Sequence, residues 1–257
     1  MKKVIVFGDL PIATEVAKFL NTLNDIELVG VVSEKRHKMN VDPFSSECLY
    51  DYAKNAFIPV YRLAELPALF QEGTLDYGLT VRYAQILRKP VLRLFREKVL
   101  NFHGGLLPEF AGLYSSCHTL LTKSPVAGGT LHLIEDETID SGEIVKRCEF
   151  EVLPDDTSES IFQKTQLALY HGFCEIAEDF FNGITEYKSQ ESYRKEGYQS
   201  GYYSKDSLQK ELMLDDKTKE MIAVHARGFE FSEHERGYIV YNNQKIYFTT
   251  KDLKDKY

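Results

Sequence analysis

Three polar residues of this chain have the types and spacing that acyl or formyl transfer to an amine requires. Asn101 and His103 lie two positions apart, so on an extended segment their side chains point to the same side. The amide can donate a hydrogen bond to a developing oxyanion, and the imidazole can act as a general acid or base. Further along the chain, Asp140 lies in an Asp-Ser-Gly sequence. If its carboxylate reaches His103, it orients the ring and raises the pKa of the imidazole.

The residues after Asn101 and His103 indicate a strand that ends in a tight loop. Residues 104–108 read Gly-Gly-Leu-Leu-Pro, and Gly and Pro interrupt regular structure. Taken singly, a histidine more often belongs to the core and an aspartate more often forms a turn. The combined pattern Asn-x-His-x-x-Leu-Leu-Pro with a later Asp-Ser-Gly is far more specific than its parts, and it indicates a three-residue polar site.

The elements that must position this site form an alternation of strands and helices. Apolar runs predict strands over 4–7, 26–32, 57–60, 75–81, 99–103 and 130–134. Helical patterns are found over 11–23, between the strand at 75–81 and residue 94, over 115–123, and from a start signal at 154–160 to about 182. This order predicts an α/β fold with a doubly wound, mostly parallel, Rossmann-like sheet. Ligands bind such sheets beyond the carboxyl ends of the strands, where Asn101 and His103 would lie.

Composition narrows the class of protein. The chain has 257 residues, enough for one α/β domain and a smaller appendage. Its four cysteines form no CxxC pair, so we expect no disulfide framework, no metal site and a reducing cytoplasmic location. The net charge of -8 disfavours a nucleic-acid partner. We expect no membrane association, because no stretch approaches the ~20 apolar residues of a membrane span and the first apolar run suits a strand better than a signal peptide.

The composition changes near residue 185. Tyrosines become frequent, a short helix is predicted over 217–226, and residues 237–248 read as two strands around an Asn-Asn turn. We therefore divide the chain into a main domain over 1–185 and a C-terminal extension over 186–257 with a helix and a β-hairpin.

The motifs resemble those of the formyltransferases that use 10-formyltetrahydrofolate. The resemblance covers about residues 1–185 and is carried by Asn101-x-His103 with Gly-Gly-Leu-Leu-Pro, by Gly112, by 129–132, and by 140–144. It implies that Asn101, His103 and Asp140 are the catalytic trio. It also implies N10-formyltetrahydrofolate as co-substrate and no metal.

The resemblance also implies where the folate binds. In that family the pterin pocket lies between the loop after the preceding strand and the segment that leads to the catalytic aspartate. The corresponding residues here are Arg82, Tyr83, Ala84, Ile86, Leu87, Asp136 and Ile139. Without the resemblance, Ile86 and Leu87 would be taken as core residues.

The acceptor is inferred by comparing branches of the family. Methionyl-tRNA formyltransferase is longer and has a basic C-terminal domain for its polyanionic substrate, and the glycinamide ribonucleotide enzyme is shorter. The extension here resembles that of nucleotide-sugar N-formyltransferases, which implies a nucleotide-linked amino sugar and a homodimer formed through the C-terminal region. A dTDP-linked 3- or 4-amino-dideoxyhexose for lipopolysaccharide O-antigen or another surface glycan is preferred, with GDP and UDP still open. One departure is that 109–113 lacks the basic residue frequent in the family.

Residues on the acceptor side are less specific. Candidates are Gly8, Asp9, Leu10, Gly105, Leu106, Tyr114 and Ser115, although residues of these types more often have structural roles. The alternatives are a methionyl-tRNA formyltransferase-like enzyme, an NAD-dependent oxidoreductase, and a non-catalytic Rossmann-like binding protein. The oxidoreductase requires a GxGxxG fingerprint that the first strand lacks, and the binding protein would be expected to lose part of the trio.

Overall fold

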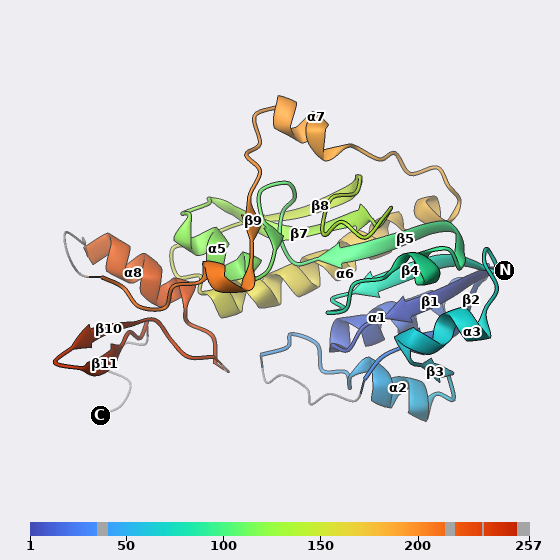
Figure 1. Ribbon diagram of the computed structural model, residues 1–257, viewed down its shortest axis with the longest axis horizontal. Coiled ribbons are helices and arrows are strands. Elements are labelled where there is room, and N and C mark those ends of the chain that lie inside the picture. Colours follow the sequence, from blue (N-terminus) through green and yellow to red (C-terminus); the bar gives the residue numbers. More distant parts are fainter. Residues whose placement is uncertain (35–40, 214–218, 233, 251–257) are drawn as a thin grey trace.

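The computed structural model describes residues 1–34, 41–213, 219–232 and 234–250, and a seven-stranded sheet forms its centre (Figure 1). Its strands are β1 (Lys2–Phe7), β2 (Ile26–Val32), β3 (Val60–Tyr61), β4 (Leu75–Val81), β5 (Phe95–His103), β7 (Val126–Leu133) and β8 (Ile144–Glu151). They are ordered β3-β2-β1-β4-β5-β7-β8. Neighbours from β3 to β5 pair in parallel, whereas β7 is antiparallel to both β5 and β8. The predicted mostly parallel α/β fold is confirmed.

Helices cover both faces of this sheet, and shorter elements extend it. The helices are α1 (Pro11–Leu20), α2 (Leu49–Asn55), α3 (Leu66–Leu69), α4 (Lys89–Leu92), α5 (Ser115–Leu121), α6 (Ser158–Phe181), α7 (Gln190–Lys195) and α8 (Lys219–Gly228), with single 3-10 turns η1 (Leu63–Glu65) and η2 (Lys205–Ser207). The short strands are β6 (Ala111–Gly112), β9 (Tyr202–Tyr203), β10 (Tyr238–Tyr241) and β11 (Gln244–Tyr247).

The core explains why β1 is apolar at every position from Val4 to Phe7. Val4 and Val6 of β1 pack with α1 and α6 on one face, and Ile5 and Phe7 pack with α3 and α4 on the other. Successive side chains of a strand point to opposite faces, so a strand buried on both faces must be apolar at every position. The long helix α6 starts at Thr157, whose side chain accepts a hydrogen bond from the backbone N–H of Ser160. These layers hold the strand ends rigidly.

Two predicted elements differ from the structure, and one strand was not predicted. The helix predicted up to residue 94 is only the short α4, because Arg82 has a left-handed φ of 53° that ends regular structure directly after β4. The strand predicted over 57–60 is β3, which starts at Val60 because Phe57 also has a positive φ. Strand β8 was not predicted, since its outward positions carry charged residues that interrupt the apolar pattern.

In the C-terminal extension, α8 and the β10–β11 hairpin lie at the opposite end of the molecule from the N-terminus, whereas α7 lies on the side of β8 (Figure 1). The predicted hairpin is β10–β11, and Asn242 and Asn243 both take the positive φ that such two-residue turns require. The predicted helix is α8, with residues 217 and 218 outside the described part of the chain. The extension docks through β9, which pairs with β6, and through α8, which contacts α5. Among the described residues, no helix has the length and apolar character to span a membrane.

His118 on α5 joins the main domain to this extension. Its ring stacks on Tyr203 with 3.9 Å between ring centroids, and its Nε2 lies 2.9 Å from the hydroxyl of Ser207. Only 5% of the residue is exposed. Burial lowers the pKa of His118 from 6.5 to about 4. The folded protein therefore holds this imidazole neutral where the unfolded chain would protonate it.

We predict that the free energy of unfolding falls as the pH is lowered from about 6.5 to about 4. In that window the unfolded chain binds a proton at His118 that the folded protein does not, so one such group contributes at most about 1.4 kcal/mol per pH unit. His118→Phe keeps an aromatic ring against Tyr203 but cannot bind a proton. Denaturant unfolding at several pH values should therefore show that the free energy of unfolding depends less steeply on pH in the variant. An identical pH dependence of the free energy of unfolding in both proteins would contradict this role of His118. Some dependence should remain, because burial also lowers the pKa of His103 and His225.

Candidate active site

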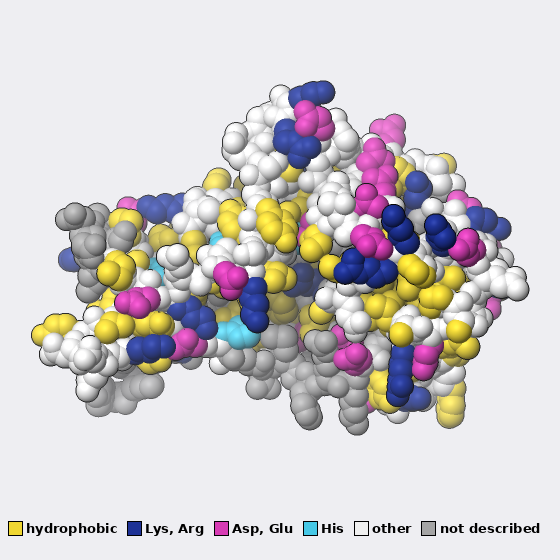
Figure 2. Space-filling view, in the orientation of Figure 1, with side chains coloured by type: hydrophobic (Ala, Val, Ile, Leu, Met, Phe, Trp, Pro, Cys, Tyr) yellow, Lys and Arg dark blue, Asp and Glu magenta, His cyan; other side chains and the backbone are white. Residues whose placement is uncertain are grey.

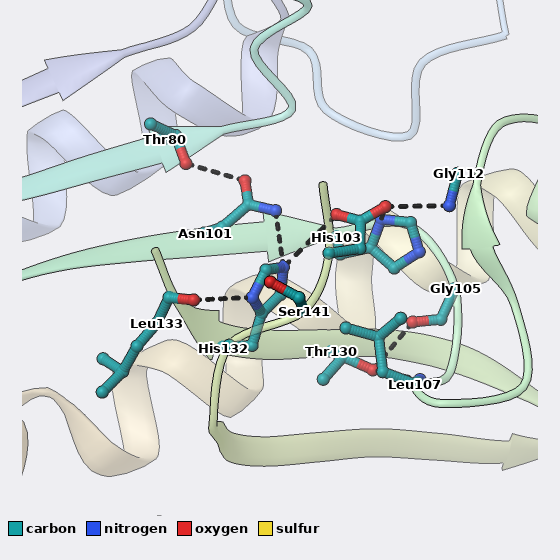
Figure 3. Close-up of polar contacts among 12 residues, drawn as sticks. Thr80, Asn101, His103, Gly105, Leu107, Gly112, Thr130, His132, Leu133 and Ser141 are labelled. Atoms are coloured by element: carbon teal, nitrogen blue, oxygen red, sulfur yellow. Dashed lines mark hydrogen bonds and ion pairs between the residues drawn. The ribbon is translucent and has the colours of Figure 1, made fainter. Parts of the chain in front are cut away.

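The predicted polar residues meet at the carboxyl end of β5, next to a histidine that sequence analysis did not select (Figure 3). Asn101 is paired with Thr80 of β4 on one side and with His132 of β7 on the other. His132 matters only because the antiparallel register of β5 and β7 sets it beside Asn101. In the sequence, His132 is one histidine within the strand predicted over 130–134. Without the register of β5 and β7, nothing indicates that it reaches Asn101.

Hydrogen bonds fix the orientation of the Asn101 amide. The Thr80 hydroxyl donates to Oδ1 of Asn101 over 2.7 Å, and Nδ2 of Asn101 lies 2.8 Å from Nε2 of His132. His132 Nδ1 lies 2.9 Å from the Leu133 carbonyl, which can only accept, so in the neutral ring the proton is on Nδ1 and Nε2 accepts from Asn101. The amide keeps one N–H that has no partner among the described residues and that can meet a ligand.

His103 is held between a backbone carbonyl and a carboxylate. Its Nε2 lies 2.7 Å from the Phe110 carbonyl and therefore donates to it, which leaves Nδ1 facing Oδ2 of Asp140 at 3.4 Å. Burial lowers the pKa of His103, and the charge of Asp140 opposes that effect without reversing it. The ring is thus neutral at pH 7, with the lone pair of Nδ1 available to take a proton.

Asp140 connects the two histidines. Its Oδ2 accepts from the Gly112 backbone N–H over 2.8 Å, and its Oδ1 lies 3.4 Å from Nε2 of His132. Burial raises the pKa of the carboxyl, but His103, His132 and the Gly112 N–H together outweigh burial and hold the pKa at about 2. Asp140 is therefore ionised at neutral pH. Its φ of 51° lies in the left-handed region, a conformation that costs roughly 1–3 kcal/mol and is found most often at functional sites.

The loop after His103 is tied to β7. The Thr130 hydroxyl donates to the Gly105 carbonyl over 2.7 Å and accepts from the Leu107 backbone N–H over 2.9 Å. Thr130 is fully buried and Leu106 nearly so. Gly105 and Leu106 therefore shape this loop, and neither residue lines the cavities described below.

A first cavity, of about 480 Å³, opens onto the polar cluster. Asn101, His103, His132 and Asp140 form one end of it. All seven residues that sequence analysis assigned to folate line its walls, namely Arg82, Tyr83, Ala84, Ile86, Leu87, Asp136 and Ile139. The structure thus brings these residues together beside the trio, and their role as folate contacts stays a prediction.

A second cavity, of about 540 Å³, begins at the other side of the same loops. Tyr114 and Ser115 line it, together with Phe162 and Phe229. The two cavities share four lining residues, which are Arg82, Gly112, Leu113 and Lys205. Two molecules bound in the two cavities would therefore approach one another at these four residues, next to Asp140, which accepts a hydrogen bond from Gly112.

The predicted residues at the end of β1 are placed elsewhere. Gly8, Asp9 and Leu10 line neither cavity. Asp9 is 3% exposed and accepts hydrogen bonds from the backbone N–H of Glu34 and the hydroxyl of Ser33. A Cβ at Gly8 would come within 2.7 Å of the Val81 carbonyl oxygen, so glycine is required there by the close approach of β4.

We predict that an NMR titration of carbon-13-labelled histidines gives His103 a pKa below 6.5 in the wild type and a still lower one in Asp140→Asn. Burial lowers this pKa, and the Asp140 charge is the largest effect that opposes burial. His103→Gln identifies the signal by its loss. A pKa above 6.5, or one that does not change in Asp140→Asn, would be inconsistent with the described geometry.

Comparison with known proteins places this geometry in a family. Residues 2–176 match the sequence model of the formyl transferase family. The methionyl-tRNA formyltransferase of Elusimicrobium minutum is 26% identical over 165 residues, which are 63% of this chain and 49% of that protein. This chain thus spans about half the length of that relative.

Solved structures are similar over nearly the whole chain. The N-formyltransferase from Helicobacter canadensis, solved with folinic acid and dTDP-3-aminofucose, has a TM-score of 0.75 at 22% identity and covers 96% of this chain and 86% of its own. A 4-N formyltransferase from Francisella tularensis has a TM-score of 0.76 at 19% identity, and the match covers 98% of this chain and 99% of that protein. These two proteins share the fold. Because the family model matches more than half of its length, this chain belongs to the formyl transferase family.

Proposed function

We propose that this protein is an N-formyltransferase that moves a formyl group from N10-formyltetrahydrofolate to the amine of a nucleotide-linked amino sugar. One observation carries the proposal: Asn101, His103 and Asp140 line the first cavity, and Asp140 accepts a hydrogen bond from the backbone of Gly112, which lines both cavities. A group transfer between two bound molecules requires this arrangement, because the donor and the acceptor must meet at the catalytic residues. Family membership identifies the transferred group as formyl.

The first cavity suits the folate. Ile86, Leu113 and Ile139 line it, and their apolar side chains are 41%, 50% and 45% exposed. Exposed apolar side chains that gather in one cavity are typical of a ligand-binding site. A flat, partly apolar ring system can cover them, and backbone groups of the adjacent 136–140 turn can meet its polar edge. The Helicobacter canadensis protein, which has the same fold, was solved with folinic acid.

The second cavity suits an anionic nucleotide sugar because of Arg82. Its guanidinium lies against Gly104, where a Cβ would collide with it, and forms no hydrogen bond or ion pair with the described residues. Its Nε is buried, and burial lowers its pKa while Asp140 opposes that effect. The guanidinium also lies 5.9 Å from the Phe162 ring, and an anionic ligand would give it the hydrogen-bond partner that the described residues do not supply. Lys205 and Lys210 line the same cavity as Asp206 and Glu235, and Lys210 lies 3.4 Å from the Glu235 carboxylate, so Lys205 is the ammonium group best suited to a phosphate.

Within this proposal the described side chains account for each proton and charge. The neutral amine attacks the formyl carbon, and the free N–H of Asn101 stabilises the oxyanion that forms. Nδ1 of His103 accepts the proton released by the amine and returns it to N10 as the carbon–N10 bond breaks. Asp140 stays ionised throughout and stabilises the transient imidazolium from 3.4 Å.

The same proposal includes an assembly and a pathway. On the β10–β11 hairpin the exposed residues include Val240, Tyr241, Ile246 and Tyr247, and apolar side chains gather over this hairpin in Figure 2. An exposed apolar patch of this kind favours a homodimer through the C-terminal extension. We prefer a dTDP-linked 3- or 4-amino-dideoxyhexose over the GDP or UDP forms, since the relative from Helicobacter canadensis was solved with dTDP-3-aminofucose. The product would serve cytoplasmic steps of lipopolysaccharide O-antigen or other surface-glycan synthesis.

Asn101→Ala and His103→Ala should each lower kcat by about 10²–10³-fold, because each removes a group that stabilises the transition state or moves its proton. The assay follows 10-formyltetrahydrofolate consumption with dTDP-3-aminofucose. Arg93→Ala is the matched control, since this exposed side chain pairs only with Glu72 at the surface. Melting temperatures should stay close to wild type. Turnover near the wild-type rate in either active-site variant would refute the assigned roles.

Arg82→Met should weaken the binding of dTDP and dTDP-3-aminofucose roughly tenfold or more, since a charge-assisted hydrogen bond contributes about 1.5–3 kcal/mol. It should not lower the melting temperature of the free protein, because the variant removes a partly buried charge that forms no hydrogen bond or ion pair with the described residues. Calorimetric titration measures the first effect and a thermal melt the second, with Lys146→Met, a partly exposed residue that lines neither cavity, as the control. Unchanged affinity for both ligands would exclude Arg82 from the acceptor site, and stabilisation by transfer RNA or NAD instead would favour the alternative functions.

A further inference from the structure

Gln190, the first residue of α7, contacts the turn that carries Asp140. Its Nε2 donates to the Asp140 carbonyl over 2.7 Å and to the Gly142 carbonyl over 3.1 Å. Both amide hydrogens are therefore used, and the residue is 9% exposed. Gln190 belongs to the C-terminal extension and lies beyond the region that matches the family model, residues 2–176.

The turn needs such a contact because its backbone conformation is unusual. Asp140 has a left-handed φ of 51°, and Gly142 is packed so closely on the Leu133 carbonyl that a Cβ would collide with it. These features direct the carbonyls of Asp140 and Gly142 to the same side. Gln190 supplies the hydrogen bonds found for these two carbonyls among the described residues. A buried carbonyl without a partner is unfavourable, so the amide stabilises this conformation of the turn over others.

The segment that carries Gln190 is itself anchored to the site. Lys188 and Ile144 exchange two backbone hydrogen bonds of 2.9 Å, which ties the segment before α7 to the start of β8. Beyond Gln190, the guanidinium of Arg147 lies 5.3 Å from the ring of Tyr193 and 4.7 Å from that of Tyr198. Arg147 in turn forms two hydrogen bonds with the Glu109 carboxylate, beside the loop after His103. The amide of Gln190 is therefore fixed relative to both loops of the active site.

We infer that Gln190 is a positioning residue, which holds the Asp140 turn so that the carboxylate faces His103 and His132. Gln190 does not line either cavity, so it acts through Asp140 and not on a ligand. The inference rests on the proposed function for its effect on catalysis. Its effect on the Asp140–His103 contact depends on geometry alone, because the 3.4 Å distance from Nδ1 to Oδ2 changes directly when the turn relaxes.

The test compares Gln190→Leu with Arg194→Ala on the same helix. Leucine keeps much of the volume but removes both donors, whereas the exposed Arg194 bonds only to Glu191 and Ser200 at the surface. In Gln190→Leu, kcat with dTDP-3-aminofucose should fall about 10- to 100-fold, and KM for both substrates should stay within about twofold. The His103 pKa, read by NMR titration, should fall below the wild-type value because the Asp140 charge moves away. Arg194→Ala should match the wild type in every measurement.

Two results would overturn the inference. One is a His103 titration curve in Gln190→Leu that coincides with the wild-type curve. The other is an equal change in Arg194→Ala, which would indicate a general effect of disturbing α7. The titration requires no substrate, so it decides the role of Gln190 even if the wild type formylates none of the sugars offered. Absence of turnover in the wild type would count against the proposed function and not against the positioning role.

Discussion

The buried carboxylate of Asp140, held between two imidazoles, is the constraint on which the rest of the site depends. With 9% of its side chain exposed, this charge requires compensation from groups that the fold brings to it. The Gly112 N–H donates a hydrogen bond to it, and the rings of His103 and His132 each lie 3.4 Å away, so that three different segments meet at the carboxylate. The strained φ of Asp140 is the cost of placing the carboxylate where all three can reach it. Conversely, the segments must pack so that these three groups stay next to the carboxylate.

The same constraint gives the site its chemistry. Because Asp140 stays ionised and His103 stays neutral, the pair can store a proton briefly without changing its packing. Asn101 is oriented by Thr80 and His132 so that one N–H stays free, and such preorganisation avoids the cost of reorienting a dipole during the reaction. In the proposed function the two cavities bring the donor and the acceptor to adjoining sites. Arg82 lies in the wall that the cavities share, and its charge interacts with that of Asp140.

Features set by neighbouring residues were predictable from the sequence, and features set by distant pairing were not. The strands ending near Phe7, Val81 and His103 follow from mainly apolar runs, and the trio follows from a specific motif. Strand β8 and His132 escaped prediction because their roles depend on the antiparallel register beside β5, which no local pattern encodes. Gln190 carried no signal at all, since its partners are backbone carbonyls far away in the chain.

The most direct test of the central claim follows the formyl group itself. Wild-type protein is mixed with 10-formyltetrahydrofolate labelled with carbon-13 in the formyl group and with dTDP-3-aminofucose, and the products are identified by mass spectrometry in a single turnover. The account predicts the label on the amine of the sugar, formed at the same rate at which the folate loses it. Label that appears only as formate, or no transfer to any dTDP-, UDP- or GDP-linked amino sugar, would contradict it.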